Sequence, residues 1–204
     1  TLNVKNKRIK VLVATHAWFD YPHIFGMKNF TDFLDFTKFT IENAKKNKKV
    51  DWFFKPHPAE DWYGGIKLED ILPKNQPNMF LVGSSDGQSL PLTYFDIVIT
   101  VHGTIALEAS ILNKIVVCAD NSYYNDWGFV HNPRSKRDYK LILSNIENLK
   151  PLKNNTKKLA AACLYGALGS PIKSSKRLHL SCDSLGMNLV PKIINQIRKD
   201  KNKI

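Results

Sequence analysis

Short apolar runs alternate along the chain with longer stretches in which apolar residues recur at helical spacing. The runs are rich in Val, Ile and Phe, and we predict strands at residues 9–15, 50–54, 79–82, 95–101 and 115–119. Helices are predicted at residues 30–47, 66–72, 104–112, 153–168 and 189–199. Strands that are apolar on both faces and are joined by helices indicate a parallel sheet covered on both sides. The predicted fold class is therefore α/β, a Rossmann-like doubly wound parallel sheet.

The size and composition of the chain suit one domain. It has 204 residues, of which 43% are hydrophobic. We expect a single domain over residues 1–204, with its core at about 9–169 and a C-terminal segment at 170–204 that includes the last helix. No apolar run approaches the ~20 residues that a membrane-spanning helix needs. Three widely spaced cysteines form no disulfide framework, which favours a reducing cytoplasm.

The chain is strongly basic, with 30 Lys and Arg against 18 Asp and Glu and a formal net charge of +12. This balance favours an acidic partner such as a phosphate group, an anionic polysaccharide or a lipid headgroup. The alternative is a general richness in Lys and Asn over a solvated surface, as at residues 45–49. No zinc-finger spacing or RNP-like run occurs, so we expect no nucleic-acid partner.

Polar residues follow the predicted strands at the points where the strands end. In doubly wound sheets these carboxyl ends meet at one edge, where ligands bind near the switch point. Pro56 and Pro58 restrict the residues before them, which directs Lys55 and His57 toward extended geometry. The alternative is that histidine simply tolerates strand ends. The residues expected to share one site are His16, Lys55, His57, Pro58, Ser84, His102, Gly103 and Thr104.

The stretch from His102 to Glu108 predicts a phosphate site with a ribose site beside it. Gly103 allows a tight turn, and Thr104 opens a helix whose first N–H groups attract anions. Glu108 follows one turn later on the same helix face, where a carboxylate can accept hydrogen bonds from a ribose diol. The alternative for Glu108 is an ordinary acid on the helix surface.

The motifs that are missing from the sequence narrow the function further. No GxGxxG follows the first predicted strand and no GxxxxGK[ST] occurs, which argues against dinucleotide oxidoreductases and P-loop NTPases. The strand-end histidines stand on separate loops without an HxH or HExxH pair, so we expect no metal ion and no cofactor. Imidazoles that donate hydrogen bonds to phosphate fit the excess of Lys and Arg better than imidazoles that bind a metal ion.

The ordered set Lys55-Pro56-His57-Pro58, His102-Gly103-Thr104 and Glu108-Ala109 resembles the nucleotide-binding half of GT-B glycosyltransferases. It is most similar to the capsule polysaccharide biosynthesis family, which includes Kdo transferases. The stretch His16-x-x-x-Asp20 looks like the entry of that family into its C-terminal domain. The resemblance covers about residues 9–130.

This resemblance implies a role for four of the strand-end residues. His57 is expected to hold a phosphate of a CMP-sugar donor, and Gly103 and Thr104 to bind the same phosphate or the nucleotide. Glu108 is expected to take the ribose hydroxyls. No metal ion is implied, because the helix dipole and side chains stabilise the leaving phosphate.

A GT-B enzyme has two Rossmann-like domains, and this chain has room for one. We therefore expect the donor-binding domain of a larger glycosyltransferase, with the N-terminal acceptor domain absent from this chain and no turnover by the chain alone. His16 and Asp20 are the catalytic candidates, with Asp61 as a further possible base. The expected partners are a CMP-sugar or related nucleotide donor and an anionic polysaccharide or glycolipid acceptor. The expected location is the cytoplasm, with peripheral contact at the inner face of the cell membrane.

Three other functions stay open on the residues alone. They are a polyol-phosphate transferase that uses CDP-glycerol, an enzyme like the UDP-sugar epimerases, and a non-catalytic module that binds nucleotide or glycan. Outside the strand ends, we interpret Arg134, Lys136 and Arg137 as a solvated loop, with contact to an anionic acceptor or to the missing domain as the alternative.

Overall fold

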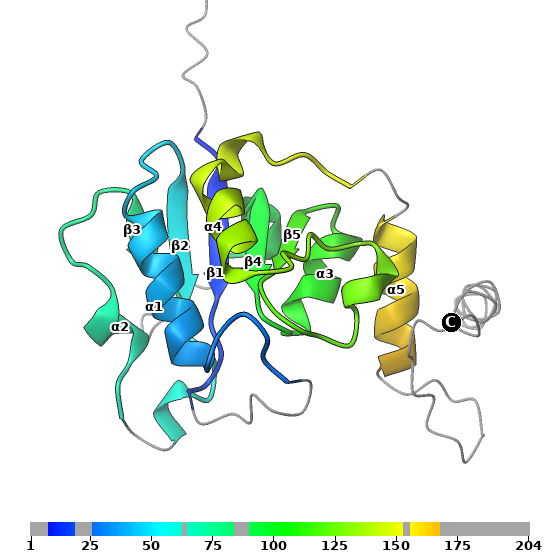
Figure 1. Cartoon of the computed structure of the whole chain (residues 1–204), viewed down its shortest axis with the longest axis horizontal. Coiled ribbons are helices and arrows are strands. Elements are labelled where there is room, and N and C mark those ends of the chain that lie inside the picture. Colours follow the sequence, from blue (N-terminus) through cyan, green and yellow to red (C-terminus); the bar gives the residue numbers. More distant parts are fainter. Residues whose placement is uncertain (1–7, 19–25, 63–64, 84–89, 153–155, 168–204) are drawn as a thin grey trace, which may run out of the picture.

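The computed structural model describes residues 8–18, 26–62, 65–83, 90–152 and 156–167, and contains a five-stranded parallel sheet (Figure 1). The strand order is β3-β2-β1-β4-β5, and every neighbouring pair is parallel. The predicted Rossmann-like sheet is confirmed; four strands lie inside their predicted ranges, and β2 ends one residue beyond its range, at Lys55. The strands are β1 (Lys10–Ala14), β2 (Asp51–Lys55), β3 (Met79–Leu81), β4 (Ile97–Thr100) and β5 (Ile115–Cys118).

Five α-helices lie in the described part of the chain, and four of them fall at predicted positions. They are α1 (Phe33–Ala44), α2 (Leu68–Ile71), α3 (Ile105–Ile111), α4 (Lys136–Ser144) and α5 (Thr156–Ala167). Short 3₁₀ turns occupy Glu60–Trp62, Leu92–Tyr94, Asn125–Trp127 and Ile146–Asn148. None of the described helices combines the length and the apolar character needed to cross a membrane. The predicted helix at 189–199 and the segment 170–204 lie outside the described residues.

The sheet separates two apolar layers, because successive side chains of a strand point to opposite faces. On one face Val11 and Val13 of β1 pack in a cluster with α1 and α4. On the other face Leu12 of β1 packs in a cluster with α3 and α5. Both faces are therefore covered by helices, as the two-sided apolar strands predicted.

Helix α4 corrects the interpretation of residues 134–137 as a solvated loop. The Ser135 side chain accepts a hydrogen bond from the Asp138 N–H (3.1 Å) and caps a helix that begins at Lys136. The helix buries Tyr139, whose hydroxyl lies 2.9 Å from the Thr40 hydroxyl of α1. The signal was present in the sequence as a capping serine followed by apolar residues at helical spacing.

A buried carboxylate joins the end of β5 to the segment that leads into α1. Asp120 follows β5, and its Oδ1 accepts hydrogen bonds from the N–H groups of Lys28 and Asn121, both at 2.7 Å. Its Oδ2 accepts from the N–H groups of Asn29 (2.8 Å) and Phe30 (3.1 Å). Four backbone donors therefore depend on one side chain, and the start of α1 depends on that anchor.

We predict that Asp120→Asn destabilises the fold by about 2–4 kcal/mol. The amide puts an NH₂ group where one oxygen now accepts two backbone N–H groups, and buried donors without acceptors cost about 1–3 kcal/mol each. Urea unfolding measures the change. Asp126→Asn, at an exposed acid in the 3₁₀ turn Asn125–Trp127, removes the same charge and is the matched control. If the two variants unfold at the same midpoint concentration of urea, the anchoring role of Asp120 is contradicted.

Candidate functional site

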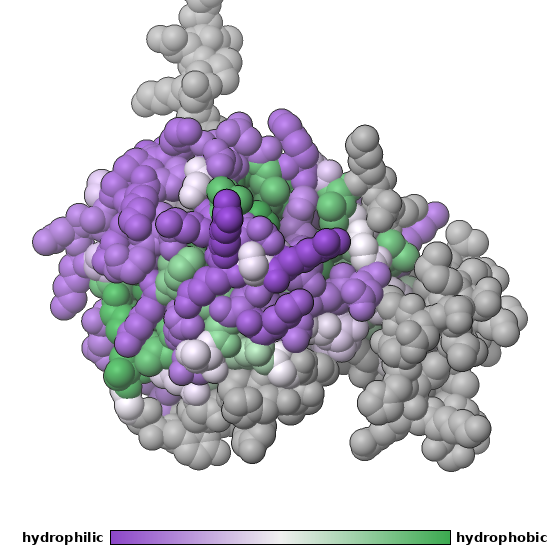
Figure 2. Space-filling model, viewed as in Figure 1, coloured by the Kyte–Doolittle hydropathy of each residue, from purple (hydrophilic) through white to green (hydrophobic). Residues whose placement is uncertain are grey.

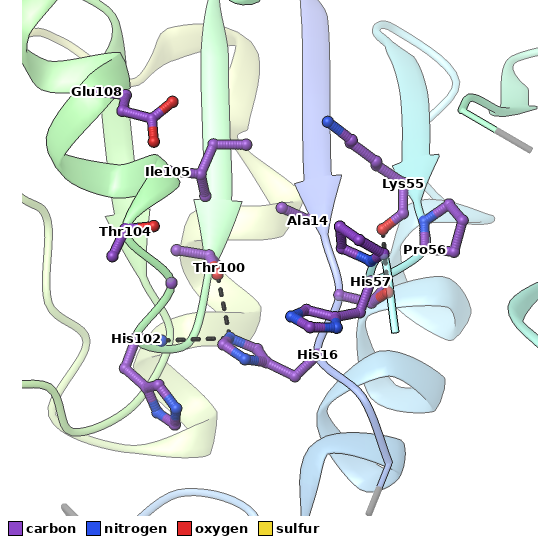
Figure 3. Close-up of a pocket in the computed structure, with 13 residues that line it drawn as sticks. Ala14, His16, Lys55, Pro56, His57, Thr100, His102, Thr104, Ile105 and Glu108 are labelled. Carbon is purple, nitrogen blue, oxygen red and sulfur yellow. Dashed lines mark hydrogen bonds between the residues drawn. The ribbon is translucent and has the colours of Figure 1, made fainter. Parts of the chain in front are cut away.

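A cavity of about 430 Å³ opens at the carboxyl ends of β1, β2 and β4 (Figure 3). It lies at the switch point of the sheet, since β1 pairs with both β2 and β4. All the strand-end residues named above except Ser84 line it, and so does Glu108. Ser84 and Asp20 fall outside the described residues. The lining residues are Ala14, Thr15, His16, Lys55, Pro56, His57, Pro58, Thr100, His102, Gly103, Thr104, Ile105 and Glu108.

The two prolines around His57 belong to a turn that defines the tautomer of the histidine. The His57 carbonyl accepts a hydrogen bond from the Glu60 N–H (3.0 Å), with Pro58 at the turn position that proline prefers. Within the same turn, the Ala59 N–H donates to Nδ1 of His57 (3.1 Å). Nδ1 is therefore an acceptor, and the proton of the neutral ring is on Nε2. The turn makes His57 Nε2 a hydrogen-bond donor at the cavity wall.

His16 forms the buried floor of the cavity as a neutral ring. Its Nε2 accepts a hydrogen bond from the His102 N–H (3.4 Å) and lies 3.2 Å from the Thr100 hydroxyl. The ring stacks on Phe33 at a centroid distance of 4.4 Å. Burial lowers the pKa of His16 from 6.5 to about 3, with smaller contributions from His102 and His57. His16 therefore remains uncharged at physiological pH and positions the loop after β4.

Backbone contacts bring the loops after the strands together. Both the N–H and the hydroxyl of Thr15 donate to the Lys55 carbonyl at 3.0 Å, which ties the end of β1 to the end of β2. Gly103 packs so closely that a Cβ at this position would lie 3.0 Å from the Thr100 hydroxyl oxygen. A side chain at this position would require the Thr100 hydroxyl to shift by a few tenths of an ångström.

The α3 side of the cavity carries hydroxyl and carboxylate groups. Thr104 immediately precedes α3, and its carbonyl accepts hydrogen bonds from the N–H groups of Leu107 (2.9 Å) and Glu108 (3.3 Å). Thr104 and Glu108 are exposed and stand one helical turn apart on the cavity side of α3 (Figure 3). Lys55 and Glu108 are the two charged side chains among the described lining residues apart from the histidines. Their two formal charges balance.

A second cavity, of about 520 Å³, lies beside the first along the same edge of the sheet. The two cavities share the segment from Lys55 to Pro58. In the second cavity Asp61 forms an ion pair with Lys67 (2.8 Å), and Glu60 accepts a hydrogen bond from the Leu68 N–H (3.0 Å). The base candidate Asp61 therefore faces a lysine in the neighbouring cavity.

Sequence reasoning missed two residues that shape the site. Phe33 belongs to α1 and stacks on His16, and the Thr100 hydroxyl lies against the same ring. Thr100 ends β4 two residues before His102, a position that could have identified it. Phe33 carries no such signal, because it is one of several apolar residues on the buried side of α1.

The described residues contain no group of three His, Cys, Asp or Glu side chains that could hold a metal ion. Two of the histidine nitrogens at the cavity accept hydrogen bonds from backbone N–H groups. His16 Nε2 accepts from the His102 N–H, and His57 Nδ1 accepts from the Ala59 N–H. What the cavity offers chemically is a set of imidazole, hydroxyl and ammonium donors around one carboxylate.

No family model and no curated protein matches the chain. Similar solved structures include two from Thermosulfurimonas dismutans. One is the KpsC beta Kdo 2,7 transferase, with 18% identity, a TM-score of 0.45, and coverage of 69% of this chain and 46% of the other. The second is the KpsC beta Kdo 2,4 transferase, with 15% identity, a TM-score of 0.46, and coverage of 78% and 45%.

A third similar structure is the UDP-GlcNAc 2-epimerase from Neisseria meningitidis bound to UDP-GlcNAc, with 16% identity and a TM-score of 0.45. The match covers 77% of this chain and 40% of the epimerase. The chain thus spans less than half the length of each of the three proteins. These are likenesses of fold.

We predict a pH dependence of stability that originates in His16. Below pH 6.5 the unfolded state binds a proton at this residue, whereas the folded state does so only near pH 3, so stability falls as the pH is lowered. Between pH 7.5 and 5.0 this residue alone removes about 2 kcal/mol from the free energy of unfolding.

Urea unfolding of the wild type and His16→Gln at both pH values measures this contribution. The glutamine oxygen can still accept the bond from the His102 N–H but does not titrate. The pH slope of the variant should be shallower by this amount. Parallel slopes for the two proteins would show that His16 is not buried in its neutral form.

Proposed function

We propose that this domain binds a nucleotide-activated sugar, a CMP-linked donor, and is the donor-binding half of a glycosyltransferase in capsule or surface polysaccharide biosynthesis. The observation that carries the proposal is the cavity at the switch point, where the imidazole of His57, the ammonium of Lys55 and the start of α3 meet. Every described residue predicted for the donor site lines this one cavity.

A phosphate group fits the part of the cavity between β2 and α3. His57 Nε2–H, the Lys55 ammonium and the Thr104 hydroxyl are donors to phosphate oxygens in this role. In the transfer step an acceptor hydroxyl oxygen forms a bond to the anomeric carbon and loses its proton to a base. The bond between the anomeric carbon and the phosphate oxygen breaks, and its electrons leave with the nucleotide. The same donors then stabilise the negative charge that develops on the leaving phosphate, without a metal ion in this proposal.

The charge of the cavity favours a donor with one phosphate. Lys55 supplies one positive charge, Glu108 one negative charge, and His16 stays neutral. A sugar linked to a nucleoside monophosphate carries one negative charge, whereas a diphosphate-linked sugar carries two. Uncompensated charge in a partly buried site is costly, so the second charge of a diphosphate would lack a partner. This supports a CMP-linked donor over CDP-glycerol and UDP-sugars.

The acceptor side of the reaction is assigned to the part of the enzyme beyond this chain. His16 is a poor general base, because its ring is buried and its Nε2 already accepts a hydrogen bond. We assign His16 the positioning of the His102–Gly103 backbone. The anionic polysaccharide or glycolipid acceptor and the base that takes its proton then come from a second domain.

We predict that CMP and its methyl ester raise the melting temperature of the domain. At a ligand concentration about 100 times the dissociation constant, binding adds about 2.7 kcal/mol, which corresponds to a rise of about 5–10 °C. His57→Ala and Lys55→Met should abolish the rise, because each removes a phosphate donor. Lys158→Met, at an exposed lysine of α5, is the matched control and should leave the rise unchanged.

Parallel titrations with UMP, CDP and UDP separate the proposal from its alternatives. A larger response to CDP would favour a polyol-phosphate transferase, and a larger response to UDP an epimerase-like enzyme. The absence of a response to every nucleotide would overturn the donor-domain proposal in favour of a glycan-binding module.

We further predict that Glu108→Ala weakens CMP binding about tenfold and weakens 2′-deoxy-CMP binding, which retains one of the two hydroxyls, by a smaller factor. The carboxylate is proposed to accept hydrogen bonds from both ribose hydroxyls, and a hydrogen bond to a charged group contributes about 1.5–3 kcal/mol. Isothermal titration calorimetry with the two nucleotides measures the difference. If the wild type binds CMP and 2′-deoxy-CMP equally, Glu108 is an ordinary acid on the helix surface.

A further inference from the structure

A basic surface lies away from the candidate site, on the face where α1 and α4 pack side by side. We define this α1–α4 face as the outward side chains of residues 32–49 and 134–147. These residues carry nine Lys and Arg against five Asp and Glu. Figure 2 shows mainly hydrophilic residues over this side of the molecule. Nine basic against five acidic residues leave this face with a net charge of +4.

The acidic side chains of the α1–α4 face are largely occupied by partners on the same face. Asp35 pairs with Lys136 at 2.9 Å, and Glu147 pairs with Lys49 at 2.6 Å. Glu42 pairs with Lys45 at 2.5 Å, and Asp32 caps α1 by accepting from the Asp35 N–H. Among the described residues, no ion pair of this kind engages Lys38, Lys46, Arg134, Arg137 or Lys140.

A recess of about 330 Å³ lies in this face, at the end of the sheet opposite to the candidate site. It forms where α1 and α4 end, just before β2 begins. Every residue of its lining is polar, and the lining residues are Asn43, Lys46, Asn47, Lys48, Lys49, Lys140 and Ser144. The floor is rigid, because the Asn47 amide donates to the Leu143 carbonyl and to Glu147, both at 3.1 Å.

The lysines of the recess carry more positive charge than the neighbouring negative groups neutralise. Two helix C-termini meet there, and each is equivalent to about half a negative charge. Glu147 contributes one more negative charge through its pair with Lys49. Four lysines therefore face about two negative charges, which leaves a net positive recess. Its size and its amide, hydroxyl and ammonium groups fit a phosphate headgroup.

An exposed leucine stands beside this recess. Leu141 of α4 is 56% exposed, which is unusual for a large apolar side chain, and its neighbours on the helix include Arg137 and Lys140. Basic residues attract anionic lipid headgroups, and an exposed apolar side chain beside them gains by insertion at the acyl boundary. Neither polysaccharide nor free phosphate would give the leucine an apolar environment, whereas the acyl boundary of a bilayer does.

We propose that the α1–α4 face docks peripherally on an anionic lipid surface, with a headgroup phosphate in the lysine recess and Leu141 at the acyl boundary. The attachment is electrostatic and reversible. Because the recess and the candidate site lie at opposite ends of the strands, docking leaves the candidate site open. The proposal does not depend on which ligand the candidate site binds.

Vesicle co-sedimentation of the full chain tests the proposal. Vesicles of phosphatidylcholine with about 30% phosphatidylglycerol should bind the protein, those of phosphatidylcholine alone should not, and binding should weaken as salt rises. The double variant Lys46→Glu/Lys140→Glu should lower the partition coefficient at least tenfold, since each basic residue near an anionic surface contributes about fivefold.

The matched control is Lys157→Glu/Lys158→Glu on α5, which makes the same change in net charge on the opposite side of the sheet. It should retain most of the binding, and Leu141→Gln should weaken binding at a salt concentration that leaves the wild type bound. Equal losses in the two charge-reversal variants would overturn the proposal, because binding would then follow net charge alone. Binding of soluble heparin at this face without binding of vesicles would overturn it in favour of a polyanion site.

Discussion

The buried carboxylate of Asp120 is the interaction on which the arrangement of the site depends. It accepts four backbone hydrogen bonds and holds residues 28–30 against the end of β5. That segment leads into α1, where Phe33 stacks on His16. His16 in turn accepts from the His102 N–H after β4. These contacts connect the end of β5 to the ends of β1 and β4, and they define the floor of the cavity.

His16 and His57 have different tasks, although each follows a strand. His16 is neutral and buried and acts on the backbone, whereas His57 presents Nε2–H because its Nδ1 is occupied by the Ala59 N–H. Donors are therefore set in place before any ligand arrives. With little reorganisation, a site of this kind can stabilise negative charge that develops on a phosphate. This is the physical basis of the proposal that the site binds the phosphate of the leaving nucleotide.

Much of the fold could be predicted, because its signals are local. Two-sided apolar strands, helical spacing and strand-end prolines each depend on residues close together in the chain, and all five strands fell where the pattern indicated. Helix α4 was missed because its apolar residues are few and its surface is rich in Arg and Lys, so the stretch looked like a solvated loop. Its stability comes from Tyr139 against α1, a contact between distant segments.

The sequence by itself determined the fold class and the set of residues that meet at one edge, since parallel strands place their ends together whatever the side chains do. Only the tertiary structure decided what each residue does there. The tautomer of His57, the neutrality of His16 and the close approach at Gly103 all depend on distances between groups from separate strands. The lysine recess likewise forms only when the ends of α1 and α4 come together. Burial and hydrogen-bond geometry arise from packing between distant segments, and no local pattern encodes them.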